Sequence, residues 1–215
     1  MNNNLFQTEY DVTHKTKLKR FYENHKFKII SFLLLLAVLI IAFFFYLEVK
    51  KNKKISLTEK YVAAKTYIDN EKKNEAIKSL VEIIHSNDST YSPLSLFLII
   101  DTNLIDDKQV ISGYFSHILK NCKFEKEIEN LIILKKALFV SSFASEAKLL
   151  ESLRPILNSE SLWKSHSLFL LGDYYLAKSK KNQAREFYLK VLEIKNLDKV
   201  LYERARIQIL LTAND

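Results

Sequence analysis

The chain has 215 residues, of which only two are glycine and two are proline, and its formal net charge is +8. Gly113 and Gly172 lie 59 residues apart, which excludes the glycine-rich loops that bind phosphates or dinucleotides and the nucleophile elbow of hydrolases. Tight two-residue hairpins are also disfavoured, so we expect an all-α chain with little need for turns at positive φ.

The positive charge lies on both sides of one uncharged segment. Residues 1–28 carry a charge of +3, residues 29–47 carry none, residues 48–54 carry +3, and the remaining 161 residues carry +2. This distribution indicates a membrane-flanking role for the basic residues. The nearly neutral remainder, with its acids interspersed among its bases, argues against a nucleic-acid-binding protein.

The first predicted element is a transmembrane helix over residues 29–47, which read IISFLLLLAVLIIAFFFYL. Its length as a helix is about 28 Å, close to the roughly 30 Å hydrocarbon core of a bilayer. A buried core helix is seldom so uniformly apolar between lysine clusters, and a cleaved signal peptide has a shorter apolar region followed by a small-residue cleavage site. We therefore expect an uncleaved anchor between a basic arm, residues 1–28, and a Lys-rich juxtamembrane stub, residues 48–55.

The orientation of this anchor does not follow from the charges. Six Lys or Arg residues lie within about twenty residues of the span on each side, so the positive-inside rule gives a tie. The single cysteine, Cys122, excludes an internal disulfide and does not distinguish one compartment from another.

After the stub, residues 56–215 show a repeating pattern of paired helices. Apolar residues recur at spacings of three and four, and residues 165–198 fit the tetratricopeptide pattern, in which a small residue on the first helix meets a small residue on the second. Weaker units fall at residues 57–90, 92–125 and 128–161, and a capping helix is expected over residues 199–212.

Equivalent second-helix positions mark the four units at a nearly constant period. They are Ala76, Ile111, Ala147 and Ala184, spaced 35, 36 and 37 residues apart, and the third unit fits only with a slip in its second helix. This period favours a tetratricopeptide-like solenoid of about four repeats and a cap over an irregular helical bundle. The predicted repeat-packing residues are Ala64, Tyr67, Ala76, Ala147, Gly172, Tyr175, Ala184 and Tyr188.

The whole layout resembles the YfgM-like proteins of proteobacteria, in particular the alphaproteobacterial type, which are ancillary subunits of the Sec translocon. The most specific stretch runs from Leu153 to Leu192 and includes Leu170-Leu171-Gly172-Asp173. The resemblance implies a single-pass inner-membrane protein with a cytoplasmic arm and a periplasmic repeat domain. It also implies association with the Sec translocon, with a membrane-anchored peptidyl-prolyl isomerase-like chaperone, and with exported client polypeptides.

Catalysis has little support in the sequence. The five histidines include no pair at i, i+4, so a local metal site is not indicated. Two S-x-x-K matches, at Ser145 and Ser161, lack the other elements of a β-lactamase-like site, and Cys122 has no activating neighbour in sequence. We expect no enzyme activity, no cofactor and no metal.

A protein-binding groove is the better hypothesis. In tetratricopeptide arrays the first helices line a concave surface, and positions two, five, nine and twelve of each repeat point into it. These positions predict groove contacts at Thr58, Tyr61, Lys65, Ile68, His166, Phe169, Asp173 and Leu176. The predicted function is a non-catalytic interaction module that assists export or periplasmic chaperoning at the Sec translocon; a scaffold for cell-envelope or division machinery is the alternative.

Overall fold

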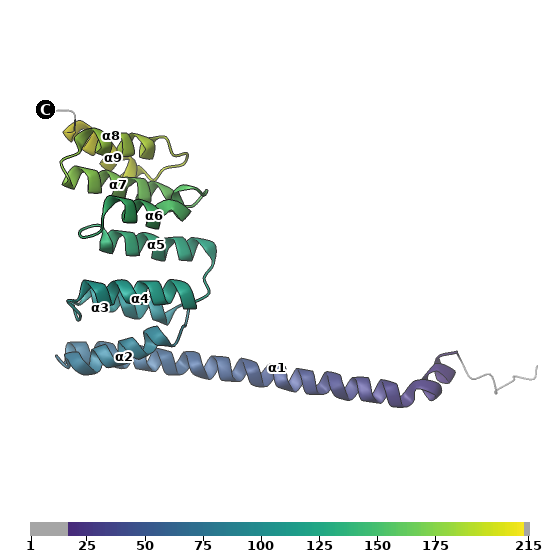
Figure 1. Cartoon of the computed structure of the whole chain (residues 1–215). Helices are drawn as coiled ribbons and strands as arrows, with labels where there is room; N and C mark the ends of the chain where they lie inside the picture. Colours follow the sequence, from purple (N-terminus) through teal and green to yellow (C-terminus); the bar gives the residue numbers. More distant parts are fainter. Residues whose placement is uncertain (1–16, 213–215) are drawn as a thin grey trace, which may run out of the picture. The chain divides into compact units, whose positions relative to one another are not determined.

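The computed structural model describes residues 17–212, and the regular structure within them is entirely helical (Figure 1). Residues 1–16 of the predicted basic arm lie outside this range. The all-α prediction is confirmed. The helices are α1 (Lys17–Asp69), α2 (Lys73–His85), α3 (Tyr91–Asp101), α4 (Lys108–Asn121), α5 (Lys126–Val140), α6 (Glu146–Leu157), α7 (Lys164–Ala177), α8 (Lys181–Leu192) and α9 (Lys199–Leu211).

Helix α1 is 53 residues long and includes both the predicted span and the Lys-rich stub. It contains no glycine or proline, and its leucines, lysines and alanines are good helix formers, so nothing in this stretch ends the helix. Its part from His25 onward is long and apolar enough to cross a membrane, and the side chains of the apolar window are not buried. The chain divides into two compact units, the first ending at Ser56 and the second beginning at Leu57.

The second unit is a row of helix hairpins. Its first hairpin joins α2 to the last part of α1, where Lys60 Nζ lies 2.8 Å from Glu82 Oε2. The next hairpins are α3 with α4, α5 with α6 and α7 with α8, and α9 packs against α8 as the predicted cap (Figure 1). Each helix therefore mainly contacts its neighbours in sequence, as expected for a repeat array.

Two apolar clusters form the core of this unit. One lies within the first two hairpins and reaches α5 through Ile132, and the other extends from α5 to α9. The half-buried Phe139 packs against both clusters. Burial of these apolar side chains, rather than intrinsic helix propensity, supplies most of the stability of such short helices.

The packing residues predicted for the first and last units are mostly buried. Ala64, Ala76, Gly172, Tyr175, Ala184 and Tyr188 are buried, and Tyr67 is half-buried.

The prediction for the third unit is wrong by two residues. Ala147 is exposed, whereas Leu149 is buried on α6 and belongs to the same core cluster as the small Ala137 of α5. The backbone is extended at Cys122 and Glu125, in the connection from α4 to α5. This connection, residues 122–125, is not longer than the others, but Ala137 lies eleven residues after the start of α5, whereas Ile99 and Gly172 lie eight residues after the starts of α3 and α7. The longer first part of α5 therefore lengthens one repeat, whereas the sequence prediction assumed a nearly constant period.

The expectation that the chain has little need for positive φ is also wrong. Glu71, Asn103 and Ser179 have φ between 52° and 60° directly after α1, α3 and α7. At each, the next residue donates its N–H back into the helix, as from Lys180 N to Tyr175 O at 2.9 Å. These are Schellman-type ends, which usually use glycine, so here other residues take the left-handed conformation.

Candidate protein-binding groove

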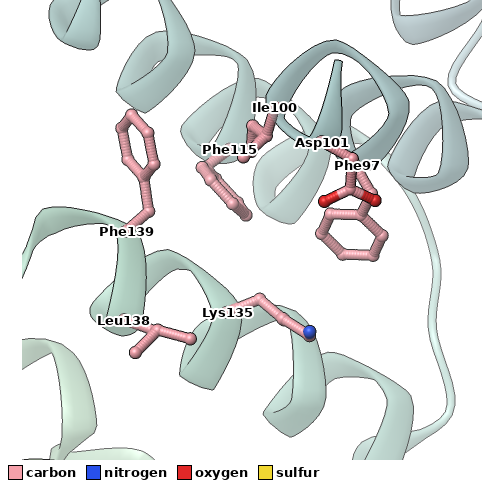
Figure 2. Close-up of a pocket in the computed structure, with 7 residues that line it drawn as sticks. All are labelled: Phe97, Ile100, Asp101, Phe115, Lys135, Leu138 and Phe139. Atoms are coloured by element: carbon pink, nitrogen blue, oxygen red, sulfur yellow. The ribbon is translucent and has the colours of Figure 1, made fainter. Parts of the chain in front are cut away.

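A hollow of about 310 Å³ lies between the first helices of the second and third hairpins (Figure 2). Phe97, Ile100 and Asp101 of α3 form one side, and Lys135, Leu138 and Phe139 of α5 form the other, with Phe115 of α4 also in its lining. Its volume falls within the range of pockets that hold a ligand side chain or small molecule. The lining is mostly apolar and carries one acidic and one basic group.

A second hollow, of about 510 Å³, continues between α5 and α7. Its lining includes Leu138 and Ser141 from the α5 side and Leu170, Asp173 and Tyr174 from α7. Leu138 lines both hollows, and its side chain is 55% exposed. We call the surface formed by the two hollows the α3–α5–α7 groove.

Local helix geometry explains why Leu138 is available for contact. Its neighbours Ala137 and Val140 are buried in the core, while Lys135 and Leu138, three residues apart on α5, share the other face. An exposed leucine between two hollows is a suitable anchor point for an apolar side chain of a partner.

Charge in the groove is mixed. Asp101 and Lys135 line the first hollow, and Asp173 and Lys178 line the second. Lys135 Nζ also lies 5.9 Å from the ring centre of Phe97, at the outer limit of a cation–π contact. The presence of both signs in each hollow favours a partner segment that carries acidic and basic residues around an apolar anchor.

Asp173 belongs to both the groove and the core. Its Oδ1 accepts a hydrogen bond of 2.7 Å from the Tyr188 hydroxyl. Burial raises the pKa of Asp173, although this hydrogen bond and the positive charge of Arg204 act in the opposite direction. Burial, and then the contact with Asp173, also raise the pKa of Tyr188. The Asp173 carboxylate is therefore held in one place by Tyr188.

The other predicted groove residues of the last repeat do not all reach this surface. Phe169 is buried between the Tyr188 ring, 5.3 Å away, and the guanidinium of Arg204, 4.7 Å away, so its prediction as a groove contact is wrong. His166 is exposed but lines a separate hollow beside the α6–α7 and α8–α9 connections. Leu176 is half-buried against the core.

None of the four residues predicted in the first repeat lines the two hollows, and two of them contact α3 instead. The hydroxyls of Thr58 and Tyr91 are 2.7 Å apart, and the rings of Tyr61 and Tyr91 are 5.9 Å apart. Lys65 is exposed, and Ile68 is half-buried against the core. These contacts join the first helix of one hairpin to that of the next.

The sequence analysis missed the groove residues of the two middle repeats. Position nine of the second repeat is Ile100, which the predicted register already contained. Position nine of the third is Leu138, but only in the register that the structure shows, with Ala137 as the small residue. The repeat pattern therefore contained both groove positions. The two-residue error in the third unit moved position nine away from Leu138.

The residues considered for catalysis have structural roles. Ser145 is the N-cap of α6 and accepts from Lys148 N, and the Ser161 hydroxyl donates to Glu127 Oε2 at 2.9 Å. Burial raises the pKa of the Cys122 thiol, which makes it a poor nucleophile. Among the described residues, no group of three or more His, Cys, Asp or Glu side chains could hold a metal ion.

Trp163, the only tryptophan, also joins neighbouring repeats. It stands at the start of α7, and its Nε1 donates to the Glu127 carbonyl oxygen of α5 at 2.9 Å. The adjacent Asn130 is fully buried and donates to the Ser161 hydroxyl at 3.0 Å. This polar network fixes the start of α7 against the start of α5.

The α7–α8 hairpin has the features of a known repeat, including the close approach of Gly172 to Tyr188. Residues 165–196 match the tetratricopeptide repeat family. Neither the curated proteins nor the solved structures contain a match to the chain. Tetratricopeptide repeats generally mediate protein–protein interaction, so the repeat at residues 165–196 indicates an interaction module.

Proposed function

We propose that this protein is a membrane-anchored interaction module whose α3–α5–α7 groove binds segments of partner proteins at the bacterial Sec translocon. The observation that carries the proposal is the pair of hollows on either side of Leu138, lined by the first helices of successive hairpins. Binding of this kind needs no catalytic group. It would assist the export or periplasmic chaperoning of newly translocated chains.

The proposed location is the bacterial inner membrane, with one span, a cytoplasmic arm and a periplasmic repeat domain. The apolar part of α1 supports the span. The orientation rests on the resemblance to the YfgM-like layout, because the flanking charges tie. A compartment-sensitive reporter fused after Asp215 tests it: activity on the periplasmic side is expected, and a cytoplasmic signal would reverse the topology.

The proposed partners are the Sec translocon, a membrane-anchored peptidyl-prolyl isomerase-like chaperone and exported polypeptides. They are supported by the same resemblance and by the mixed apolar and charged character of the groove. A groove with a few apolar anchors and charges of both signs suits short segments of many sequences better than one rigid surface.

Photo-crosslinking in intact cells tests the groove directly. A photoreactive residue at Leu138 of the full-length protein is expected to capture translocon subunits, the isomerase-like chaperone or chains in transit. The matched control is Leu189 on α8, which is also exposed but lies outside both hollows. Equal capture from both positions would refute the groove, and capture of division or cell-wall proteins from Leu138 would favour the scaffold alternative.

A charge substitution provides the complementary measurement. Leu138→Asp should lower co-purification of the captured partner by about tenfold or more, since a buried charge without a partner opposes binding. Leu189→Asp should leave it unchanged. The Leu138 side chain is more than half exposed, so the fold should tolerate the change.

A further inference from the structure

The outer face of the last helix is unusually apolar. On α9, the side chains of Val200, Ile207, Leu210 and Leu211 are 67%, 54%, 63% and 61% exposed. In the part of the chain that the structure describes, α9 packs mainly on α8, and no element covers these side chains. This face therefore calls for a partner of its own.

These side chains form one stripe, opposite the face that packs on the array. Leu201 and Ala205 are buried in the carboxy-terminal core, and Asp198 caps the helix by accepting from Val200 N and Leu201 N. Val200, Ile207 and Leu211 follow a spacing of seven and four residues, which places them on one side of a helix. The helix is thus anchored on one side and apolar on the other.

We infer that the outer face of α9 binds the same face of a second copy of this chain, with the two α9 helices antiparallel. In this arrangement Val200 of each copy lies beside Leu211 of the other, and the two Ile207 side chains meet near the two-fold axis. An isologous contact of this kind closes on itself and forms a dimer instead of an open fibre.

Charge supports a second copy as the occupant. Glu203 and Arg206 both border one side of the stripe formed by Val200, Ile207 and Leu211, with Arg206 Nη1 3.6 Å from Glu203 Oε2 within the same helix. Antiparallel pairing brings Glu203 of each copy near Arg206 of the other, so the stripe is bordered by opposite charges on both sides of the axis. Arg204 does not compete for this position, because its guanidinium stacks on Phe169 at 4.7 Å.

The size of the face sets the expected strength. Four aliphatic side chains that are more than half exposed offer on the order of 400 Å² of apolar surface per copy, about half of the roughly 800 Å² that each partner buries in a standard interface. The contact should therefore be weak in dilute solution. Confinement to one membrane, which rests on the proposed function, would raise the effective concentration of the copies and favour the dimer.

Cysteine crosslinking of the full-length protein in membranes tests the arrangement. In a Cys122→Ser background, Ile207→Cys is expected to form a disulfide-linked dimer under mild oxidation, whereas the control Leu189→Cys on α8 is not. Co-expressed Val200→Cys and Leu211→Cys chains should crosslink to each other more than either does to itself. Preferential self-crosslinking at both positions would mean parallel pairing and would overturn the inference.

Light scattering on the full-length protein in detergent provides a second measurement. Ile207→Glu should weaken dimerisation by about tenfold or more, while Leu189→Glu leaves it unchanged. A wild-type protein that is monomeric in both membranes and detergent, or a dimer that Ile207→Glu does not affect, would refute the α9 interface. Leu138→Asp should leave the dimer intact, so failure of the groove proposal and failure of the dimer are distinguished.

Discussion

The two glycines of the chain should respond in opposite directions to replacement by alanine. Both lie inside helices, Gly113 in α4 and Gly172 in α7, where alanine is ordinarily more stable by about 0.5–1 kcal/mol. A Cβ atom on Gly113 would meet nothing within 4 Å. Gly113→Ala should therefore stabilise the domain by about that amount.

At Gly172 the same Cβ would overlap the ring of Tyr188, lying 2.7 Å from its Cδ1 and 2.8 Å from its Cζ. Tyr188 is fully buried, its ring packs 5.3 Å from that of Phe169, and its hydroxyl donates to Asp173. The ring therefore cannot move without losing packing or this hydrogen bond. Overpacking of this kind costs about 1–3 kcal/mol, and a hydrogen bond to a charged group contributes about 1.5–3 kcal/mol.

After the gain in helix propensity is subtracted, Gly172→Ala should destabilise the domain by about 2 kcal/mol. For a domain of this size, that lowers the midpoint of thermal unfolding by about 4–8 °C, whereas Gly113→Ala raises it by about 1–4 °C. The fluorescence of Trp163, the only tryptophan, reports unfolding at the start of α7. The measurement uses the full-length protein in detergent.

A double variant separates steric overlap from other causes. If the Tyr188 ring is the obstacle, Gly172→Ala combined with Tyr188→Leu should cost less than the sum of the two single changes. A Gly172→Ala protein as stable as the wild type, or strictly additive effects, would refute the close-packing argument.

Three further predictions concern the carboxy-terminal hairpins. Asp198→Ala removes the acceptor for Val200 N and Leu201 N at the start of α9 and should lower the free energy of unfolding by about 1 kcal/mol in urea titrations; no change would show that the cap is unimportant. Ser179→Gly removes the strain of a side chain at φ 58° and should raise the free energy of unfolding by about 1 kcal/mol. A decrease in this free energy would contradict the strained conformation. Burial raises the pKa of Asp173 above 3.8, so the folded chain holds the proton of this carboxyl group more tightly than the unfolded chain. The resulting contribution to the free energy of unfolding is full below about pH 3.8 and is lost as the pH rises through the raised pKa. Asp173→Asn should flatten this part of the pH profile, and an unchanged profile would contradict it.

The helical repeat class could be predicted from the sequence because it depends on periodicity alone. Spacings of three and four apolar residues persist from Ile55 to the end, and the helix pairs around Ala64 and Ala76 and around Gly172 and Ala184 carry small residues on both helices. Small residues at matched positions define the register without knowledge of the loops. In both of these helix pairs, the small residues on the two helices are buried.

The groove could be predicted only in part, for a physical reason. In the third hairpin the buried small residue is on α5 alone, since Ala137 and Leu149 are the buried residues at the matched spacing of twelve. One small residue is enough for close packing when a larger side chain fills the space. The predicted repeat pattern instead assumes a small residue on both helices, and it therefore places Ala147 at the packing position of α6. The additional residues of this repeat lie within α5, before Ala137. They continue the helical spacing of three and four, so periodicity alone gives no sign of them.

Leu138 also bears on how the binding preference of this protein could change over evolutionary time. The core side chains that set the register, such as Ala137 and Leu149, have little freedom to vary. Leu138 separates the two hollows but contributes little to the core, so one substitution there would reshape both hollows and leave the scaffold unchanged. If the proposed function holds, related proteins would share one architecture yet select different partners through a single codon.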